Sequence, residues 1–425
     1  MKSLVVAIAL HLALAACHDA SIRPREAAAT DPFGGDLRVG VGKVDITPDE
    51  PIPLAGYGAR RGRPCEGISD PVFARAIVLD ADNLRVGIVA ADILLVTRAL
   101  REAVCARVGA LHLDALLLAA THNHSGPGAY WDNALAELTA MGSYDPRQFS
   151  RLVRGIGESL EQAAGALVPA RLGIASVDAG NYARNRRERG GAYDRDLTLL
   201  HVQSPDGDPL AAIVHFAAHP TVLGADNFFL SGDYPGCLSA ALEEEGYPVV
   251  LFFNGAAGEA RPSWPGPEKG FERARALGHA LAGAALQARR SIRTEERVRL
   301  RAVQLTARLP PVSSEGPAPA ALRWMADPLL ELYCPSETEL LVLGIGSFRW
   351  LAMPCDLGIG VARRIRAATP GLEVRLVSYA QDYIGYVTDA DAFASDTYES
   401  RVSFYGRELA LYLERQACEL LESSR

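Results

Sequence analysis

The 425-residue sequence lacks an excess of positive charge, an internal repeat and a long low-complexity tract. It has 43 Lys and Arg against 51 Asp and Glu, and its net charge of −8 argues against a nucleic-acid partner, which normally requires a basic face. A hydrophobic content of 49% with 22% charged residues is enough for one large or two medium globular domains, so disordered and fibrous classes are excluded.

The apolar stretch at residues 4–16 is too short to span a bilayer. It follows a short basic start and ends at Cys17, which predicts a signal peptide over residues 1–16. Leu14-Ala15-Ala16-Cys17 resembles a bacterial lipobox, which implies acylation of Cys17 and a protein anchored to a membrane surface of the cell envelope. Because His18 is not the Asp that commonly retains lipoproteins at the inner membrane, the outer membrane is favoured. The alternative is a plain secretory signal and a secreted or periplasmic protein.

Cysteine is scarce, with seven residues, and no pair has the CxxC spacing of a thiolate zinc site. Without Cys17 an even number remains, so disulfides are possible in an oxidising compartment. Their spacing does not determine any pairing.

Alternating strands and helices predict an α/β fold with mixed β-sheets flanked by helices. We expect residues 17–36 to form a flexible tether, because they are rich in Ala and show no periodicity. The fold then starts at residue 37, and a Pro-rich passage at 309–319 separates an N-terminal part, 37–308, from a smaller α/β C-terminal part, 309–425. Helix starts are indicated by Thr97 and by Asp145 followed by Pro.

Two histidines directly follow the all-apolar run at residues 115–120, which predicts a buried strand. Side chains two residues apart point to the same side of a strand, so His122 and His124 can converge on one metal ion or one substrate. The alternative is a pair of polar residues that cap a strand.

Two further apolar runs end in polar loops, the first at His219-Pro220 and the second at a loop that contains Glu259. Ligands bind at the carboxyl ends of strands in open α/β sheets, so we place His122, His219 and Glu259 at one edge. Asp92 and Asp233 also lie at strand or loop ends, where they can orient a ligand imidazole or cap a helix, and Glu259 is a candidate for the same orienting role.

Four sequence blocks between about residues 45 and 406 resemble motifs of the neutral/alkaline ceramidase family. The blocks are Thr121-His122-Asn123-His124-Ser125-Gly126-Pro127, His219-Pro220 with Ser231-Gly232-Asp233, Pro354-Cys355-Asp356 with Arg363-Arg364-Ile365-Arg366, and Gln381-Asp382-Tyr383-Ile384-Gly385-Tyr386-Val387-Thr388. Four blocks in the family's order make a chance match improbable.

The resemblance implies a ceramidase-like catalytic domain that uses Zn²⁺ to cleave an N-acyl amide bond. The metal ligands that it implies are His122, His219, Asp356 and Tyr386. Two imidazoles, a carboxylate and a phenol oxygen suit zinc and leave room for water or a substrate carbonyl. His124 would stabilise the oxyanion or protonate the leaving amine.

The resemblance further implies that Arg186 binds substrate oxygens, with Arg184 as the alternative. The sequence departs from the family pattern at three points, and these departures change the mechanism that we expect. Asp356 replaces a glutamate, no segment matches the family's C-terminal immunoglobulin-like domain, and Arg261 stands where the family has a catalytic serine. A guanidinium cannot act as a nucleophile, so we expect direct attack by water and an Arg261 that binds an anionic group of the substrate.

The leading functional hypothesis is therefore a membrane-tethered zinc hydrolase that acts on the amide of an N-acylated, lipid-like substrate. An alternative within the same class is an esterase or amidase on small cell-envelope compounds. A different class is a binding lipoprotein without catalytic activity, and Arg261 is the feature that favours it.

Overall fold

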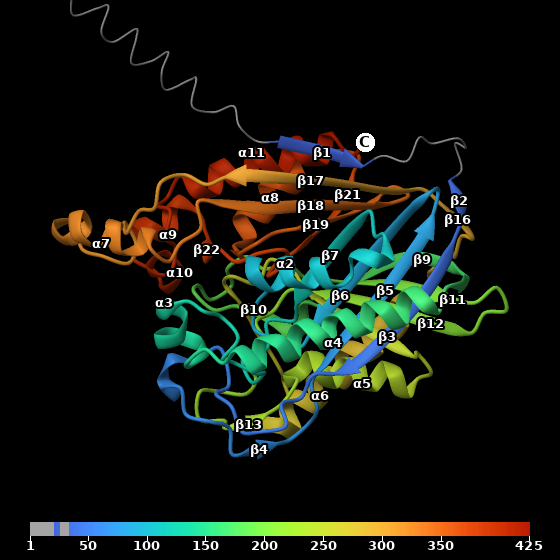
Figure 1. Ribbon diagram of the computed structural model, residues 1–425, viewed down its shortest axis with the longest axis horizontal. Coiled ribbons are helices and arrows are strands. Elements are labelled where there is room, and N and C mark those ends of the chain that lie inside the picture. Colours follow the sequence, from blue (N-terminus) through green and yellow to red (C-terminus); the bar gives the residue numbers. More distant parts are fainter. Residues whose placement is uncertain (1–20, 26–33) are drawn as a thin grey trace, which may run out of the picture.

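The computed structural model describes residues 21–25 and 34–425 (Figure 1). The expected signal peptide at residues 1–16 and the expected acylation site Cys17 lie outside these described residues. Three larger β-sheets make up the fold, and each is covered on one face by helices.

The first sheet has the strand order β7-β6-β5-β3-β8 and is mixed, because β6 and β7 are parallel and the other pairs antiparallel. Its strands are β3 (Arg38–Asp45), β5 (Phe73–Ala81), β6 (Leu84–Ala91), β7 (Ala115–Ala120) and β8 (Val168–Pro169). Helices α2 (Arg98–Arg107) and α4 (Pro146–Gly165) cover it. The Thr97 side chain accepts a hydrogen bond from the Leu100 N–H, and Asp145 caps α4 in the same way, so both predicted helix starts are confirmed.

The second sheet has the order β14-β12-β11-β9, with β12 and β14 parallel. Its strands are β9 (Arg171–Asp178), β11 (Asp196–Gln203), β12 (Pro209–Phe216) and β14 (Val249–Asn254), and its helices are α5 (Asp233–Glu244) and α6 (Gly270–Arg289). The sequence predicts a helix that starts at Pro235, but α5 already begins at Asp233. The Asp233 carboxylate accepts hydrogen bonds from the N–H groups of Tyr234 and Leu223, which stabilises the earlier start.

The third sheet has the order β1-β17-β18-β19-β21. Its strands are β1 (Ser21–Arg25), β17 (Leu300–Arg308), β18 (Glu337–Ile345), β19 (Phe348–Ala352) and β21 (Glu373–Val377), and its helices are α8 (Ile359–Ala368) and α11 (Leu409–Glu422). Two features differ from the sequence prediction. The expected tether contains β1, which pairs with β17 and forms one edge of the sheet, and the expected boundary at residue 309 falls between the paired strands β17 and β18.

The three sheets turn their inner faces toward one shared core, and their outer faces pack against the helices. In β7, Leu117 belongs to the shared core and its neighbour Leu118 packs on the helix side, as the alternation of a strand requires. Trp350 of β19 is fully buried in the shared core. Because each fully buried large apolar side chain contributes about 1.5–3 kcal/mol, this common core holds the three sheets together.

The remaining elements are short and lie in the segments that connect the larger strands and helices. The short strands are β2 (Gly35–Asp36), β4 (Gly67–Ile68), β10 (Ala183–Asn185), β13 (Phe229–Leu230), β15 (Ala260–Pro262), β16 (Arg297–Val298), β20 (Asp356–Leu357) and β22 (Tyr386–Val387). The short helices are α3 (Ala134–Ala136), α7 (Arg323–Glu331), α9 (Ala390–Ala394) and α10 (Tyr398–Arg401), together with single turns at 58–60, 109–111, 137–141, 180–182 and 320–322.

Two features of the described residues concern membrane-spanning helices and disulfides. Among residues 21–25 and 34–425, no helix is both long and apolar enough to cross a bilayer. All six cysteines in this part of the chain are unpaired.

Candidate metal centre

His122 lies two residues beyond the end of β7, where the backbone adopts a left-handed conformation with φ of 66°. Its Nδ1 atom is 2.8 Å from the Leu94 carbonyl oxygen, and its ring stacks on Tyr379 at 3.7 Å between centroids. A carbonyl can only accept, so Nδ1 carries the proton. The Nε2 lone pair of His122 is therefore free to bind a metal ion.

His124 lies beside His122, with 3.0 Å between their Nε2 atoms. A Cβ atom on Gly56 would come within 2.5 Å of His124 Nδ1, so only glycine leaves room for this ring. Burial, together with the neighbouring imidazoles, lowers the pKa of His122 to about 3, although Asp356 raises it, and lowers that of His124 well below its usual value. Both rings are neutral at pH 7, as metal ligation requires.

His219 follows β12 and points its Nε2 atom toward the same centre. Its Nδ1 atom is 2.7 Å from the Ala257 carbonyl oxygen, which fixes the tautomer as in His122. Its Nε2 atom is 3.0 Å from the Tyr386 hydroxyl and 3.3 Å from Asp356 Oδ1. The loops after β12 and β14 thus position this second imidazole.

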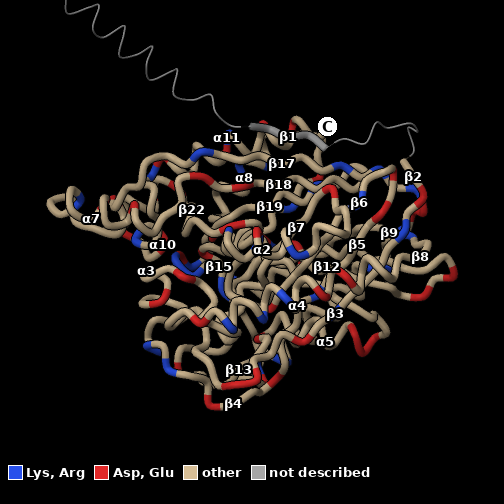
Figure 2. The backbone as a smooth tube through the Cα atoms, viewed as in Figure 1, with Lys and Arg blue, Asp and Glu red and all other residues tan. Residues whose placement is uncertain are grey.

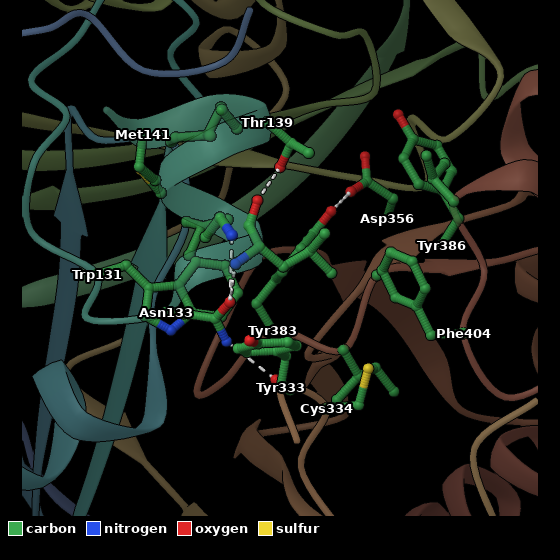
Figure 3. A pocket seen from close by; sticks show the side chains of 18 of the residues that line it. Trp131, Asn133, Thr139, Met141, Tyr333, Cys334, Asp356, Tyr383, Tyr386 and Phe404 are labelled. Carbon is green, nitrogen blue, oxygen red and sulfur yellow. Dashed lines mark hydrogen bonds between the residues drawn. The ribbon is translucent and has the colours of Figure 1, made fainter. Parts of the chain in front are cut away.

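Asp356 and Tyr386 lie directly opposite each other in the parallel pair β20–β22. The Asp356 carboxylate accepts hydrogen bonds from Tyr379 at 2.9 Å and from Tyr383 at 2.6 Å (Figure 3). Burial alone would raise the pKa of Asp356, but His122, His219 and Tyr383 lower it more, to about 2. The carboxylate is therefore ionised and held in a fixed orientation.

These groups form one cluster that suits a metal ion. The structure brings together all four expected ligands, His122, His219, Asp356 and Tyr386, and the distance between His122 Nε2 and Asp356 Oδ1 is 3.6 Å. The ligand atoms of His122, His124 and His219 also lie within 4.8 Å of one another, so His124 offers an alternative third nitrogen. Neutral imidazoles with a carboxylate and a phenol oxygen are zinc ligands by type, and the residues fit that ion.

Arg186 contacts the cluster through Tyr386. Its Nη2 atom donates a hydrogen bond to the Tyr386 oxygen at 3.1 Å, and its Nε atom donates to Glu399 at 3.0 Å. Burial disfavours the charged guanidinium, but Tyr386 and Glu399 outweigh it, so the pKa of Arg186 is raised and the side chain stays charged. Arg184, the alternative in the sequence, is exposed on β10.

The three acidic residues predicted to orient an imidazole make other contacts. Asp92 forms a buried ion pair with Arg75 at 2.6 Å. Asp233 binds backbone N–H groups at the start of α5, and burial raises its pKa to about 6. Glu259 accepts a hydrogen bond from the Ile359 N–H at 3.1 Å and so caps α8. The backbone carbonyls of Leu94 and Ala257 orient the imidazoles instead.

Four residues of the site were not singled out from the sequence: Arg60, Tyr379, Tyr383 and Glu399. Of these four residues, only Tyr383 lies inside a block that resembles a family motif, so it is the one that the sequence could have indicated. The buried Arg60 donates hydrogen bonds to the carbonyls of Ala55, His124, Gly224 and Asn227, which joins three loops around the cluster. Such long-range contacts leave no local pattern in the sequence.

A largely apolar pocket with a volume of about 180 Å³ opens on the cluster. His122, His124, Asp356 and Tyr386 form its polar end. Figure 3 shows Trp131 and Met141 on one side of this pocket and Phe404 on the other. The pocket therefore joins an apolar binding space to the candidate metal centre.

Comparisons with known proteins identify the family that the chain is similar to. The family model for neutral/alkaline non-lysosomal ceramidase, N-terminal, matches residues 37–251. A neutral ceramidase from Pseudomonas aeruginosa is 26% identical over 87% of this chain and 69% of its own, and one from Drosophila melanogaster is 28% identical over 54% of this chain and 37% of its own.

The fold is also similar to a solved structure. The crystal structure of neutral ceramidase from Pseudomonas aeruginosa superimposes with a TM-score of 0.77 at 22% identity, covering 91% of this chain and 74% of that one. The mixed α/β fold expected from the sequence is thus confirmed. Its family model, its relatives and its fold agree, and the chain belongs to the neutral/alkaline non-lysosomal ceramidase family.

Proposed function

We propose that the protein is a zinc-dependent hydrolase that cleaves the amide bond of an N-acylated, lipid-like substrate. The observation that supports this most is the apolar pocket that ends at His122, His124, Asp356 and Tyr386. An acyl chain in the pocket would place its carbonyl carbon beside these groups. Membership of the ceramidase family supports the amide as the scissile bond.

His122, His219, Asp356 and Tyr386 would hold the zinc ion. When bound, zinc supplies a Lewis acid for the acyl oxygen and for water. The chain's own residues supply the rest. Because its pKa is lowered, His124 is neutral and can donate a hydrogen bond to the developing oxyanion. Alternatively, it can accept a proton from the attacking water and then pass that proton to the leaving amine. Arg186 holds the Tyr386 oxygen and adds a fixed positive charge.

We further propose that water attacks the carbonyl directly, without an acyl-enzyme. By the resemblance to the family, Arg261 stands where a catalytic serine is expected. Ser263 donates its backbone N–H to the Tyr182 carbonyl in the loop beyond β15. Hydrolysis in Ser263→Ala should remain within about twofold of the unchanged protein, since removing a required nucleophile costs several orders of magnitude. A covalent acyl adduct trapped on Ser263 would contradict this mechanism.

The decisive experiment removes metal with a chelator and restores it with zinc, using matched amides and esters of the same acyl chain. Recovery of amide hydrolysis is the expected result. Hydrolysis of the esters alone would favour the esterase hypothesis. Stoichiometric zinc binding without any turnover would favour a binding protein.

The pocket can be tested separately by filling it. Cys334→Trp adds a large ring to the wall of the pocket and should lower kcat/KM for long-chain amides by about tenfold or more. The same variant on an acetyl or butyryl amide is the control, because short chains leave the blocked space empty. Equal losses on both substrates would argue against an acyl-binding role.

The location of the protein also remains a proposal, namely lipid anchoring to a membrane of the cell envelope. It is supported by the lipobox-like sequence that ends at Cys17. Cys17→Ser should move the protein from the membrane fraction to the soluble fraction and abolish acylation. A membrane-bound, acylated Cys17→Ser protein would refute the proposal.

A further inference from the structure

The antiparallel ribbon of β10 and β15 places two arginines directly opposite each other. Arg184 pairs with Arg261, and the next pair is Asn185 with Ala260. Directly opposite residues project to the same face with Cβ atoms about 4.5–5.5 Å apart, where like charges repel. Both arginines are exposed, so the repulsion faces solvent.

Among the described residues, no acidic side chain relieves this repulsion. Within residues 21–25 and 34–425, no carboxylate oxygen lies within 4.0 Å of a guanidinium nitrogen of Arg184, Arg261 or Arg273. The pKa of Arg261 is lowered, first by burial and then by Arg184, Arg273 and Arg186. The buried Nε atom of Arg273 also lacks a hydrogen-bond partner. These groups form an uncompensated basic cluster.

The cluster is continuous with the metal centre. Arg184 and Arg186 are two residues apart and so share the face that Arg261 occupies. The Arg186 backbone N–H donates to the Glu259 carbonyl at 2.7 Å, while its side chain binds the Tyr386 oxygen. The His219 N–H donates to the Ala260 carbonyl at 3.1 Å. In Figure 2, blue stretches of the backbone, which mark Lys or Arg, lie beside the β15 label.

We propose that Arg184, Arg261 and Arg273 form a subsite for an anionic head group of the substrate, such as a phosphate, sulfonate or carboxylate. Guanidinium groups bind such anions through paired, charge-assisted hydrogen bonds. The subsite extends from Arg186, so a substrate amide at the metal centre can direct its head group along the arginines. This inference rests on the proposed function, since it assigns the ligand as a substrate.

Binding of a non-hydrolysable probe tests the subsite without turnover. Isothermal titration with monooctyl phosphate should show binding that weakens with salt, and Arg261→Ala or Arg184→Ala should weaken it by about fivefold. Arg261→Lys should keep part of the affinity, because the positive charge remains but the paired N–H donors of the guanidinium are lost. Arg154→Ala is the matched control, an exposed arginine on α4 that should leave binding unchanged.

Three outcomes of this titration would overturn the proposal. They are unchanged affinity in Arg261→Ala and Arg184→Ala, an equal loss in Arg154→Ala, and inorganic phosphate that binds as tightly as monooctyl phosphate. The last result would mark a site for free phosphate rather than for a lipid head group.

A second experiment compares hydrolysis of N-octanoyl taurine, which has a sulfonate, with that of N-octanoyl ethanolamine, which is neutral. Arg261→Ala should lower the ratio of kcat/KM for the anionic over the neutral amide by about fivefold, mainly through KM. An unchanged ratio would overturn the head-group assignment. If neither amide is hydrolysed by the zinc-loaded protein, the proposed function fails, and the titration still reports on the anion subsite.

Discussion

Two groups of arginines near β10 differ in how their charges are balanced: Arg186 at the inner end, beside the metal centre, and Arg184 with Arg261 at the outer end, on the β10–β15 ribbon. At the inner end, Arg186 is partly buried and holds fixed contacts with Glu399 and Tyr386. At the outer end, Arg261 is exposed and faces Arg184. Among the described residues, Glu399 balances the inner charge, whereas no carboxylate forms an ion pair with the outer arginines. The comparison therefore separates a structural and positioning role from a ligand-binding role, and the following variants test that separation.

Loss of the imidazoles at the inner end should have the largest effect. In His122→Ala combined with His219→Ala, two of four expected ligands are missing, so zinc affinity should fall by at least about 100-fold. Metal analysis after dialysis measures this loss, and Arg261→Ala is the control that should retain zinc. Full zinc occupancy in the double variant would disprove the metal centre.

Breaking the inner ion pair should have the next largest effect. Glu399→Ala leaves the Arg186 guanidinium without its carboxylate, and the free energy of unfolding should fall by about 3 kcal/mol. Urea denaturation measures the change. If Glu399→Ala were no more destabilising than a substitution of exposed Arg154, the contrast between the two ends would be lost.

Glu259 should make folding pH-dependent. Burial raises its pKa from 4.5 to about 7, so the folded state binds a proton that the unfolded state has already released. The contribution of Glu259 to stability is therefore present below pH 4.5 and is lost as pH rises toward 7, by an amount on the order of 2 to 3 kcal/mol.

Glu259→Gln is the variant that isolates this effect, because the amide stays neutral throughout. Denaturation of both proteins between pH 4.5 and 8 should give a difference in unfolding free energy that declines up to pH 7 and is constant above it. A difference that does not depend on pH would refute the raised pKa.

Arg261→Ala should have the smallest effect on stability. Removing one of two opposed positive charges should raise the free energy of unfolding by about 0.3 kcal/mol at low ionic strength. The gain should vanish at about 1 M salt, where the Debye length is short. A destabilisation above about 1 kcal/mol would show that Arg261 has a structural contact.

Local features of the fold and the site could be predicted from the sequence. The apolar run before His122 predicted β7, and Thr97 and Asp145 predicted two helix starts, because strands and caps depend on neighbouring residues. The family motifs identified all four residues that converge on the centre. Resemblance was needed for Asp356 and Tyr386, since no local pattern singles them out.

Contacts between distant segments could not be predicted in this way. Glu399 lies 213 residues from Arg186, and Glu259 turned out to cap α8 rather than to orient an imidazole. Likewise, β7 and β12 belong to separate sheets, so the shared position of His122 and His219 arises from the common core and not from one sheet edge. These arrangements depend on tertiary packing, which a single sequence does not display.

The order of the ligands along the chain has a consequence for protein synthesis. His122 follows β7 of the first sheet and His219 follows β12 of the second sheet, while Asp356 and Tyr386 belong to β20 and β22, which come after most of the third sheet. A nascent chain that has not yet emerged past residue 386 therefore presents imidazoles without the carboxylate and the phenol. Imidazole ligands alone suit copper and nickel as well as zinc, so any preference for zinc should depend on the carboxylate and the phenol. These two groups join the site only when β20 and β22 have paired.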